Sequence, residues 1–313
     1  MKKITQKIRL ITSIFMGLSL PAKSNAQLPY YEPVSGVSGT LKSVGSDSLN
    51  NIMALWVENF QAIYTNVTIQ FEGKGSSTAP PALTEGIAQL GPMSRQMKVE
   101  ELDNFETKYG YKPTRVEVAL DALAVFVHKD NPIKGLSLQQ LDSIFSNTYK
   151  KGGSPINRWG AVGLGGSWKN KAISIYGRNS LSGTYGYFKK IALDKGNFTS
   201  RVQEKPDSSS VVLSISSNLS GIGYSGVGYL TSGVRGIPID GAEPIFENCI
   251  TGDYPLARFL NIYVNKKPGK KLDKLTFEFL RFALSQEGQE VVEIYGYFPM
   301  ESELAEKVLL GLE

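Results

Sequence analysis

Short apolar runs typical of β-strands alternate along the chain with amphipathic helical patterns, and this alternation constrains the fold more than any other feature. In residues 67–71 the apolar side chains alternate strictly with polar ones, which indicates a strand. The segment before it carries apolar residues at spacings of three and four, which indicates one face of a helix. These apolar residues are Leu49, Ile52, Met53, Trp56, Phe60 and Ile63. The order of elements favours an α/β chain with largely parallel sheets.

The same order continues towards the end of the chain. After the glycine-rich loop 73–78, a second helix is expected to carry Leu83, Ile87 and Leu90. Further strands are expected at 114–128, 172–178, 221–230 and 257–265. Further helices are expected at 136–145, where Ser137 is the cap, around Tyr185, Phe188 and Ile191, and at 275–296 and 301–313.

Two of the predicted strands are expected to run from one domain of the protein to the other. A chain of 313 residues is long enough for two domains with cores of their own. The run 114–128 is long enough to cross from one domain to the other, and a second crossing near 257–265 makes the first lobe discontinuous. The predicted division is 27–122 and 255–313 for lobe I, and 123–254 for lobe II.

Residues 1–26 have the pattern of a secretory signal peptide. A basic start is followed by an apolar stretch and by small residues, which predicts cleavage between Ala26 and Gln27. The apolar stretch is too short for a membrane anchor, and no cysteine near the cut could carry a lipid. We therefore expect an exported protein that is soluble and periplasmic, with release from the cell or retention at the cell surface as alternatives.

Charge gives no indication of a nucleic-acid or membrane partner. Five of the 34 basic residues lie in residues 1–26, so 29 basic and 29 acidic residues remain after cleavage. A net charge near zero provides no electrostatic basis for binding a polyanion or a membrane surface.

The chain has one histidine and one cysteine, which limits the kinds of enzyme it could be. Cys249 has no partner for an internal disulfide, and His128 alone cannot form a histidine metal cluster. A nucleophile activated by histidine would need His128. That residue follows an apolar strand pattern, and we interpret it as a strand-end residue. No catalytic residue, metal or cofactor is expected.

The segment 177–184, GRNSLSGT, has the composition of an anion site. Arg178 follows a predicted strand, and Ser182, Gly183 and Thr184 lead directly into a predicted helix. Backbone N–H groups at a helix start, hydroxyl groups and a guanidinium group together suit a tetrahedral oxyanion. The alternative interpretation is an ordinary strand-to-helix turn that Ser182 caps.

Two further loops, 45–48 and 73–77, also end in hydroxyl residues at predicted helix starts. Loops at the carboxyl ends of parallel strands converge at one edge of a sheet, so we expect all three to meet. Their helix N-termini would add free N–H donors without a large net charge. By contrast, the G-x-G-x-x-G match at 221–226 continues a strand pattern, so we do not interpret it as a dinucleotide site.

The order of seven segments carries a resemblance to a known family. They are VGSDSLNNIM, FEGKGSSTAPPAL, LGPMSRQM, ALDALAVFVHKDNPI, LSLQQLDSIF, IYGRNSLSGTYGYF and GIGYSGVGYL. Through essentially the whole chain after residue 26, this order resembles the PstS family, the phosphate-binding components of bacterial phosphate ABC transporters. The R-x-x-x-S-G-T element at 178–184 is its most specific part. The resemblance implies a two-lobe periplasmic binding protein type II fold, with mixed, mostly parallel sheets, helices on both faces and a ligand cleft at the hinge.

The resemblance also implies a set of phosphate-binding residues, with Arg178 as the charged contact. They are Asp47, Ser48, Ser76, Ser94, Arg178, Ser182, Gly183 and Thr184. The chain departs from the family pattern at three positions. Ser94 and Ser180 stand where many members have aspartate, and Asp47 stands where threonine or serine is common. We hypothesise that Asp47 accepts the proton of hydrogen phosphate and so disfavours sulfate.

The predicted function is the capture of inorganic phosphate between two lobes and its delivery to the membrane permease of an ABC transporter. The chain is expected to act as a monomer and to catalyse no reaction. The alternatives are a binding protein for another oxyanion such as sulfate or molybdate, a secreted phosphate-handling enzyme, and a surface adhesin on the same fold.

Overall fold

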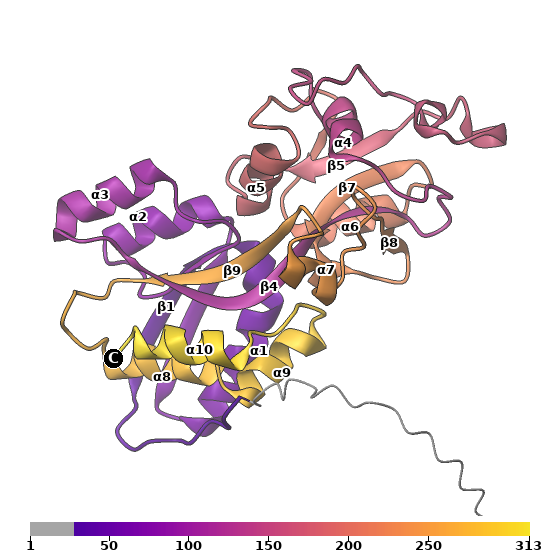
Figure 1. Cartoon of the computed structure of the whole chain (residues 1–313). Coiled ribbons are helices and arrows are strands. Elements are labelled where there is room, and N and C mark those ends of the chain that lie inside the picture. The colour runs from indigo at the N-terminus through magenta and orange to yellow at the C-terminus, as the bar shows by residue number, and fades with distance from the viewer. Residues whose placement is uncertain (1–27) are drawn as a thin grey trace, which may run out of the picture.

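The computed structural model describes residues 28–313, which alternate between strands and helices over two halves of the molecule (Figure 1). The predicted signal peptide, residues 1–26, lies outside the described residues. None of the helices within 28–313 combines the length and the apolar composition that a membrane crossing needs.

The strands and helices have the following bounds. The strands are β1 (Gly39–Gly45), β2 (Val67–Gly73), β3 (Gly91–Met93), β4 (Thr114–His128), β5 (Ser174–Arg178), β6 (Gln203–Lys205), β7 (Gly221–Gly226), β8 (Val234–Gly236) and β9 (Ala257–Val264). The α-helices are α1 (Asn50–Ile63), α2 (Ala79–Thr84), α3 (Val99–Tyr109), α4 (Leu138–Phe145), α5 (Gly183–Ile191), α6 (Ser208–Ser216), α7 (Phe246–Thr251), α8 (Lys274–Ala283), α9 (Gln286–Ile294) and α10 (Ser302–Leu310). Short 3₁₀ turns are η1 (Asp47–Leu49), η2 (Ser76–Thr78), η3 (Trp159–Val162), η4 (Gly166–Trp168) and η5 (Val227–Tyr229).

Strand β4 joins the two halves of the molecule. Its first part, as far as Ala122, pairs antiparallel with β9, and from Leu123 onwards it pairs antiparallel with β7. The register with β9 shifts between Glu117 and Ala119, which places a β-bulge within the first part. Strand β3 lies beyond β9, and β5 and β6 lie beyond β7. The predicted lobe boundary at 122/123 therefore falls where β4 changes partner, and the division into lobes stays a prediction.

The sheets are mixed, but they are less parallel than predicted. The pairs β1–β2, β5–β6 and β5–β7 are parallel, whereas every pair that β4 makes, and the β3–β9 pair, is antiparallel. Parallel neighbours need a crossover connection, and α1 provides one between β1 and β2. Strands β7 and β9 instead return alongside β4 in the opposite direction.

Most predicted elements are present, but the second predicted helix is shorter than expected. Helix α2 begins with Pro80 near its N-terminus and ends at Thr84, because Gly86 adopts a left-handed conformation with φ of +71°. Ile87 is 59% exposed and lies outside the helix. Leu90 is fully buried, but it forms a bridge to Ser43 of β1 rather than a helical face.

The predicted helix 275–296 is in fact two helices, α8 and α9. The break occurs because Ser285 is an N-cap whose hydroxyl accepts a hydrogen bond from the backbone N–H of Gly288 at 3.3 Å. A side chain at Gly288 would collide with the carbonyl oxygen of Phe282. Glycine at this position therefore allows α9 to pack closely against the end of α8. Similarly, the predicted strand 221–230 ends at Gly226 and continues as η5.

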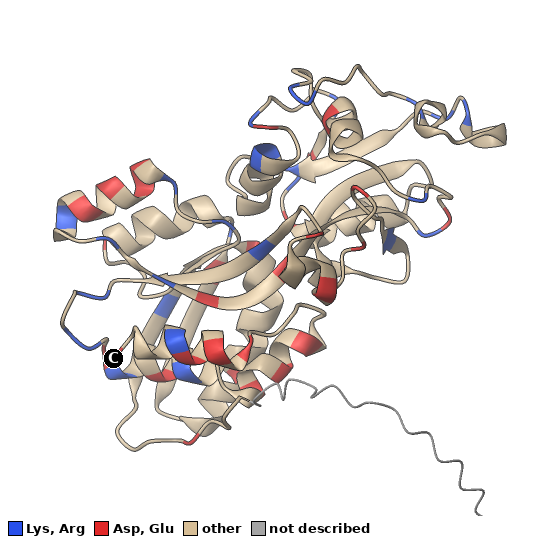
Figure 2. Ribbon diagram, in the orientation of Figure 1, with Lys and Arg blue, Asp and Glu red and all other residues tan. Residues whose placement is uncertain are grey.

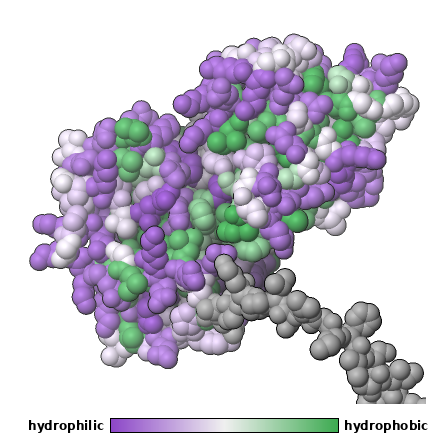
Figure 3. All heavy atoms as spheres, viewed as in Figure 1, coloured by the Kyte–Doolittle hydropathy of each residue, from purple (hydrophilic) through white to green (hydrophobic). Residues whose placement is uncertain are grey.

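The hydrophobic core runs through both halves. Beneath β1 and β2, Trp56 of α1 is fully buried, and its indole N–H donates to the carbonyl of Gly288 at 2.7 Å. In the other half, the rings of Phe188 and Tyr224 stack with centroids 4.0 Å apart. On the face in view, acidic and basic residues are interspersed over α3 and the C-terminal helices (Figure 2). That face is mostly hydrophilic, with separate hydrophobic groups on both halves (Figure 3).

Removing the Ser285 cap should destabilise the junction between α8 and α9. We expect Ser285→Ala to lower the free energy of unfolding by about 1 kcal/mol, because the Gly288 N–H loses its acceptor. Urea denaturation followed by circular dichroism measures the change. The control is Ser200→Ala, which alters an exposed serine. Equal stability of the two variants would contradict the cap as the cause of the break.

Candidate functional site

The hydroxyl loops predicted from the sequence meet at one buried place. The Ser48 hydroxyl, from η1, lies 3.0 Å from the Thr184 hydroxyl at the start of α5. The Ser76 hydroxyl, from η2, lies 3.3 Å from that of Ser94, which follows β3. Ser94 and Thr184 are in turn 3.5 Å apart between their hydroxyl oxygens. Side chains from four separate loops therefore form one network.

Sequence reasoning missed one member of this network, Ser46. Its hydroxyl donates to the Ser94 hydroxyl at 3.0 Å and accepts a bond from the backbone N–H of Ser48. We call Ser46, Ser48, Ser76, Ser94 and Thr184 the hydroxyl cluster. Each of the five is at most 2% exposed. The signal was present in the sequence, since Ser46 is the residue that caps the turn at 47–49.

Two glycines allow the loops to touch. A β-carbon at Gly183 would lie 2.1 Å from the Ser76 hydroxyl oxygen and 2.7 Å from that of Ser94. Gly75 has φ of +136°, and a β-carbon there would lie 2.5 Å from the carbonyl oxygen of Leu181. Both contacts join the loop after β2 to the loop after β5. Glycine is required at 183 because backbone and hydroxyls approach one another closely there.

Ser182 is a helix cap, as the alternative interpretation of its segment predicts. Its hydroxyl accepts a hydrogen bond from the backbone N–H of Tyr185 at 3.3 Å, so it caps α5. Ser182 is 1% exposed and directly precedes the two cluster contacts at Gly183 and Thr184. Arg95 points elsewhere, because it forms two bonds of 2.7 Å with the carboxylate of Glu101 in α3.

A buried ion pair joins Arg178 at the end of β5 to Asp47 in η1. The two terminal nitrogens of Arg178 donate to the two carboxylate oxygens at 2.8 and 2.7 Å. Their remaining hydrogens bond to the Ser208 hydroxyl at 2.9 Å and to the Pro206 carbonyl at 3.0 Å. The side chains of Arg178 and Asp47 are 0% and 3% exposed. Four of the five N–H donors of this guanidinium group are thus engaged.

This pairing contradicts the hypothesis that Asp47 is free to accept a ligand proton. Besides the two bonds from Arg178, the carboxylate accepts bonds from the backbone N–H and the hydroxyl of Ser208. Ser180, where the family resemblance places an aspartate, leaves Arg178 without an acidic neighbour two residues away. Asp47 supplies that acid from another loop. The sequence could not reveal this, because the two residues are 131 positions apart.

A second buried ion pair, between Asp121 of β4 and Arg258 of β9, was not predicted. Arg258 donates from Nε to one oxygen of Asp121 at 2.9 Å, and its Nη2 lies 2.8 Å from the same oxygen in an ion pair. Nη2 also donates to the Thr184 hydroxyl at 3.1 Å, which places the pair against the hydroxyl cluster. The other Asp121 oxygen accepts the backbone N–H of Val227 at 3.0 Å. Burial raises the pKa of Asp121, and Arg258 acts against that shift.

A signal for this second pair does exist in the sequence. Asp121 and Arg258 are charged residues inside the two long apolar strand runs, and such residues are rarely buried unless they are paired. With both pairs formed, two arginines and two aspartates leave the buried region neutral. The site therefore offers hydroxyl groups and guanidinium N–H groups without net charge.

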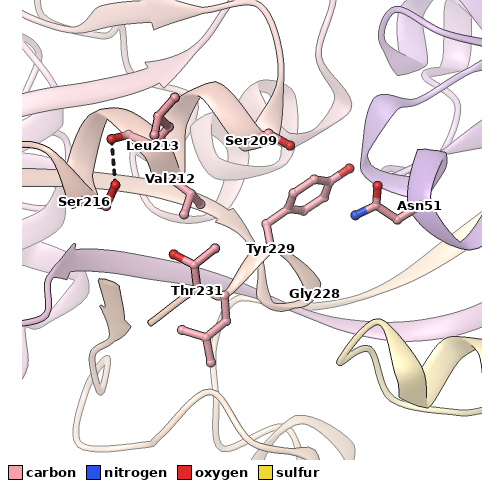
Figure 4. A pocket seen from close by; sticks show the side chains of 9 residues that line it. Asn51, Ser209, Val212, Leu213, Ser216, Gly228, Tyr229 and Thr231 are labelled. Atoms are coloured by element: carbon pink, nitrogen blue, oxygen red, sulfur yellow. Dashed lines mark hydrogen bonds between the residues drawn. The ribbon is translucent and has the colours of Figure 1, made fainter. Parts of the chain in front are cut away.

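A surface pocket of about 280 Å³ adjoins the site (Figure 4). It is lined by Asn51 of α1, Ser209, Val212, Leu213 and Ser216 of α6, and Gly228, Tyr229, Leu230 and Thr231. Tyr229 connects it to the ion pair, since the phenol donates to the backbone carbonyl of Asp47 at 2.7 Å. None of the eight predicted site residues lines this pocket. Within residues 28–313 no group of three or more His, Cys, Asp or Glu side chains could hold a metal.

The lone histidine and the lone cysteine lie in ordinary structural positions. His128 ends β4, as predicted, and its Nδ1 accepts the backbone N–H of Asp130 at 3.1 Å. Cys249 is buried in α7, and burial raises the pKa of its thiol to about 12. At neutral pH the thiol stays protonated and is not an activated nucleophile.

The fold is that of a known class of protein. A sequence profile of the PBP superfamily domain matches residues 32–287. A structure from Clostridium perfringens, described as a phosphate ABC transporter substrate-binding protein with bound phosphate, superposes with a TM-score of 0.72 and 26% sequence identity. The superposition covers 84% of this chain and 100% of that one. The fold and the site thus define a member of the PBP superfamily, and the predicted fold class is confirmed.

Two relatives of known name narrow the superfamily to one family. The phosphate-binding protein PstS of Pseudomonas aeruginosa is 52% identical over 321 residues, which cover 100% of this chain and 99% of that protein. The phosphate-binding protein PstS of Bacillus subtilis is 29% identical, over 96% of this chain and 95% of that protein. The chain belongs to the PstS family, as the order of its motifs predicted.

Breaking the Asp47–Arg178 pair should destabilise the protein strongly. We expect Asp47→Asn to lower the free energy of unfolding by about 3–5 kcal/mol, because Arg178 would remain buried with no counter-charge. The measurement is urea denaturation in buffer free of phosphate. Asp103→Asn, at an exposed position in α3, is the control. If Asp47→Asn were as stable as this control, the pair would not hold the loops together.

Proposed function

We propose that this protein binds inorganic phosphate at the hydroxyl cluster and delivers it to the permease of an ABC transporter. The observation that carries the proposal is the convergence of five buried hydroxyl groups in one cluster, with Arg258 bonded to Thr184 at its centre. The high identity to a relative named as a phosphate-binding protein supports the same ligand. The proposed ligand contacts are the residues predicted from the sequence other than Asp47, which is paired with Arg178, and they are joined by Ser46.

The chemistry of the cluster suits a small tetrahedral oxyanion. Each hydroxyl can rotate to donate a hydrogen bond to a phosphate oxygen or to accept one from the P–OH group of hydrogen phosphate. A hydrogen bond to a charged group contributes about 1.5–3 kcal/mol, so a few such donors give tight binding without net positive charge. Phosphate would replace the present hydroxyl contacts, such as that of 3.0 Å between Ser48 and Thr184.

Access to this buried place would need the two halves to separate. The hydroxyls of Ser48, Ser76 and Ser94 come from proposed lobe I, and Thr184 comes from proposed lobe II. We place the lobe boundaries at the predicted positions, with a hinge where β4 changes partner. Closure around an anion would then assemble both sets of donors, which is the usual motion of binding proteins with two lobes.

We also propose that the protein is exported to the periplasm, acts as a monomer and catalyses no reaction. Export is supported by the signal-peptide pattern of residues 1–26. The absence of catalysis is supported by the names of its relatives, which describe binding, and by the protonated thiol of Cys249. A binding role also requires no cofactor.

Calorimetric titration of the mature protein, stripped of phosphate by unfolding and refolding, tests the ligand. We expect one phosphate to bind per chain, and sulfate and molybdate to bind more weakly. An assay with a chromogenic phosphate ester, with and without divalent metals, should show no turnover. Tight binding of sulfate or molybdate with no phosphate signal would show that phosphate is not the ligand. Hydrolysis of the ester would show that the protein is an enzyme and not only a binding protein.

Gly183 offers a local test of where phosphate binds. Gly183→Ala should weaken phosphate binding about tenfold or more, because the added methyl group would push the Ser76 and Ser94 hydroxyls out of place. Gly165→Ala is the matched control, since a β-carbon at Gly165 meets no atom within 4 Å. Titration calorimetry of both variants measures the effect. Unchanged affinity in Gly183→Ala would place the ligand elsewhere.

A further inference from the structure

We propose that Arg258 is a second arginine contact to the bound anion and that it acts through its Nη1 nitrogen. This inference rests on the proposed function and adds a residue that is not among the eight predicted site residues. The proposal starts from the position of Arg258. The side chain is 2% exposed, and its Nη2 donates to Thr184, a central member of the hydroxyl cluster.

One part of the Arg258 guanidinium group has no partner. Nε and Nη2 share one oxygen of Asp121, and the second hydrogen of Nη2 is directed to Thr184. Nη1 is buried and has no hydrogen-bond partner among residues 28–313. A buried donor of a charged group that makes no bond is costly, so a partner for it is expected.

The planar shape of the guanidinium group indicates where Nη1 points. The two terminal nitrogens share one edge of the plane, on which each carries an N–H in a nearly parallel direction. Asp121 takes the other edge, formed by Nε and Nη2. Because Nη2 uses the shared edge to reach Thr184, Nη1 presents a parallel N–H beside the Thr184 hydroxyl. An oxyanion bonded to that hydroxyl would lie within reach of Nη1.

Arg178 is less available than the sequence indicated. Both of its terminal nitrogens are fully used by Asp47, Ser208 and Pro206, which leaves only Nε without a partner. Arg258 keeps a whole terminal nitrogen with two hydrogens. The charged donor with the greater remaining capacity is therefore on β9, where Asp121 is its counter-charge.

The test compares Arg258→Lys with the wild-type protein by calorimetric titration with inorganic phosphate. Lysine keeps the charge opposite Asp121, but its three N–H donors share one nitrogen, which cannot occupy the separate positions of Nε, Nη2 and Nη1. We expect phosphate affinity to fall about tenfold or more, which corresponds to the loss of one charged hydrogen bond. Equal affinity would overturn the proposal. If the wild-type protein itself failed to bind phosphate, the proposed function would fail instead.

Arg281→Lys is the matched control. Arg281 donates from Nε and Nη2 to one oxygen of Glu278, at 2.9 and 2.7 Å, which is the same arrangement as in the Arg258 pair. It lies in α8 and its bonds go to Glu278 and to the carbonyl of Glu32, not to the hydroxyl cluster. Its phosphate affinity should match that of the wild-type protein. A loss as large as in Arg258→Lys would show a general effect of altering an arginine–carboxylate pair and would overturn the proposal.

A double-mutant cycle separates direct contact from an effect through Thr184. If Nη1 contacts the anion, Arg258→Lys should still weaken binding about tenfold in a Thr184→Val background. No further loss there would reduce Arg258 to a positioning residue. Should Arg258→Lys fail to fold, the double variant Asp121→Asn, Arg258→Gln removes both charges and carries the same expectation. Wild-type affinity in that double variant would overturn the proposal.

Discussion

A buried ion pair between loops of different sheets is the interaction on which the arrangement of the site depends. Asp47 follows β1, and Arg178 ends β5, so their two bonds connect segments that share no strand pairing. Both charges have left water, which is costly unless every donor and acceptor is satisfied. Ser208 and Pro206 bond the remaining hydrogens of the two terminal nitrogens of Arg178, so that only its Nε lacks a partner. With this pair in place, the starts of η1 and α5 are brought together, and the hydroxyl cluster forms between them.

The two arginine pairs give the site an unusual electrostatic character. Each guanidinium group is matched by a carboxylate within hydrogen-bonding distance, so the buried region carries oriented donors but little net charge. A site of this kind recognises an anion by the geometry of short-range hydrogen bonds. It does not depend on a positive field at the surface. Binding should accordingly depend little on the salt concentration.

Local sequence patterns were sufficient for much of the fold and for the loops of the site. Periodicity located α1, β2 and β4, and hydroxyl residues at turns located the cluster, because both signals lie within a few neighbouring residues. Contacts between residues that lie far apart in the sequence could not be predicted from local patterns. The carboxylate of Asp47 has Arg178 as its partner, and no spacing rule connects positions 131 apart. Arg258 was missed because a single charged residue inside an apolar strand does not show which group its side chain contacts. The end of α2 depends on the left-handed conformation of Gly86, and the break between α8 and α9 depends on the Ser285 cap, neither of which the helical spacing of apolar residues reports.

The path of β4 has a consequence for how the molecule could open. Asp121 and Arg258 face each other across paired strands, β4 and β9, and are partners in the register of that ladder. Asp47 and Arg178 belong to separate sheets. If the halves rotate about the long strand, the first pair travels as one piece of a ladder, while the second must be pulled apart. The open form would then keep one arginine masked by its own carboxylate at the pivot and expose the other, with Asp47 hydrated on the opposite wall.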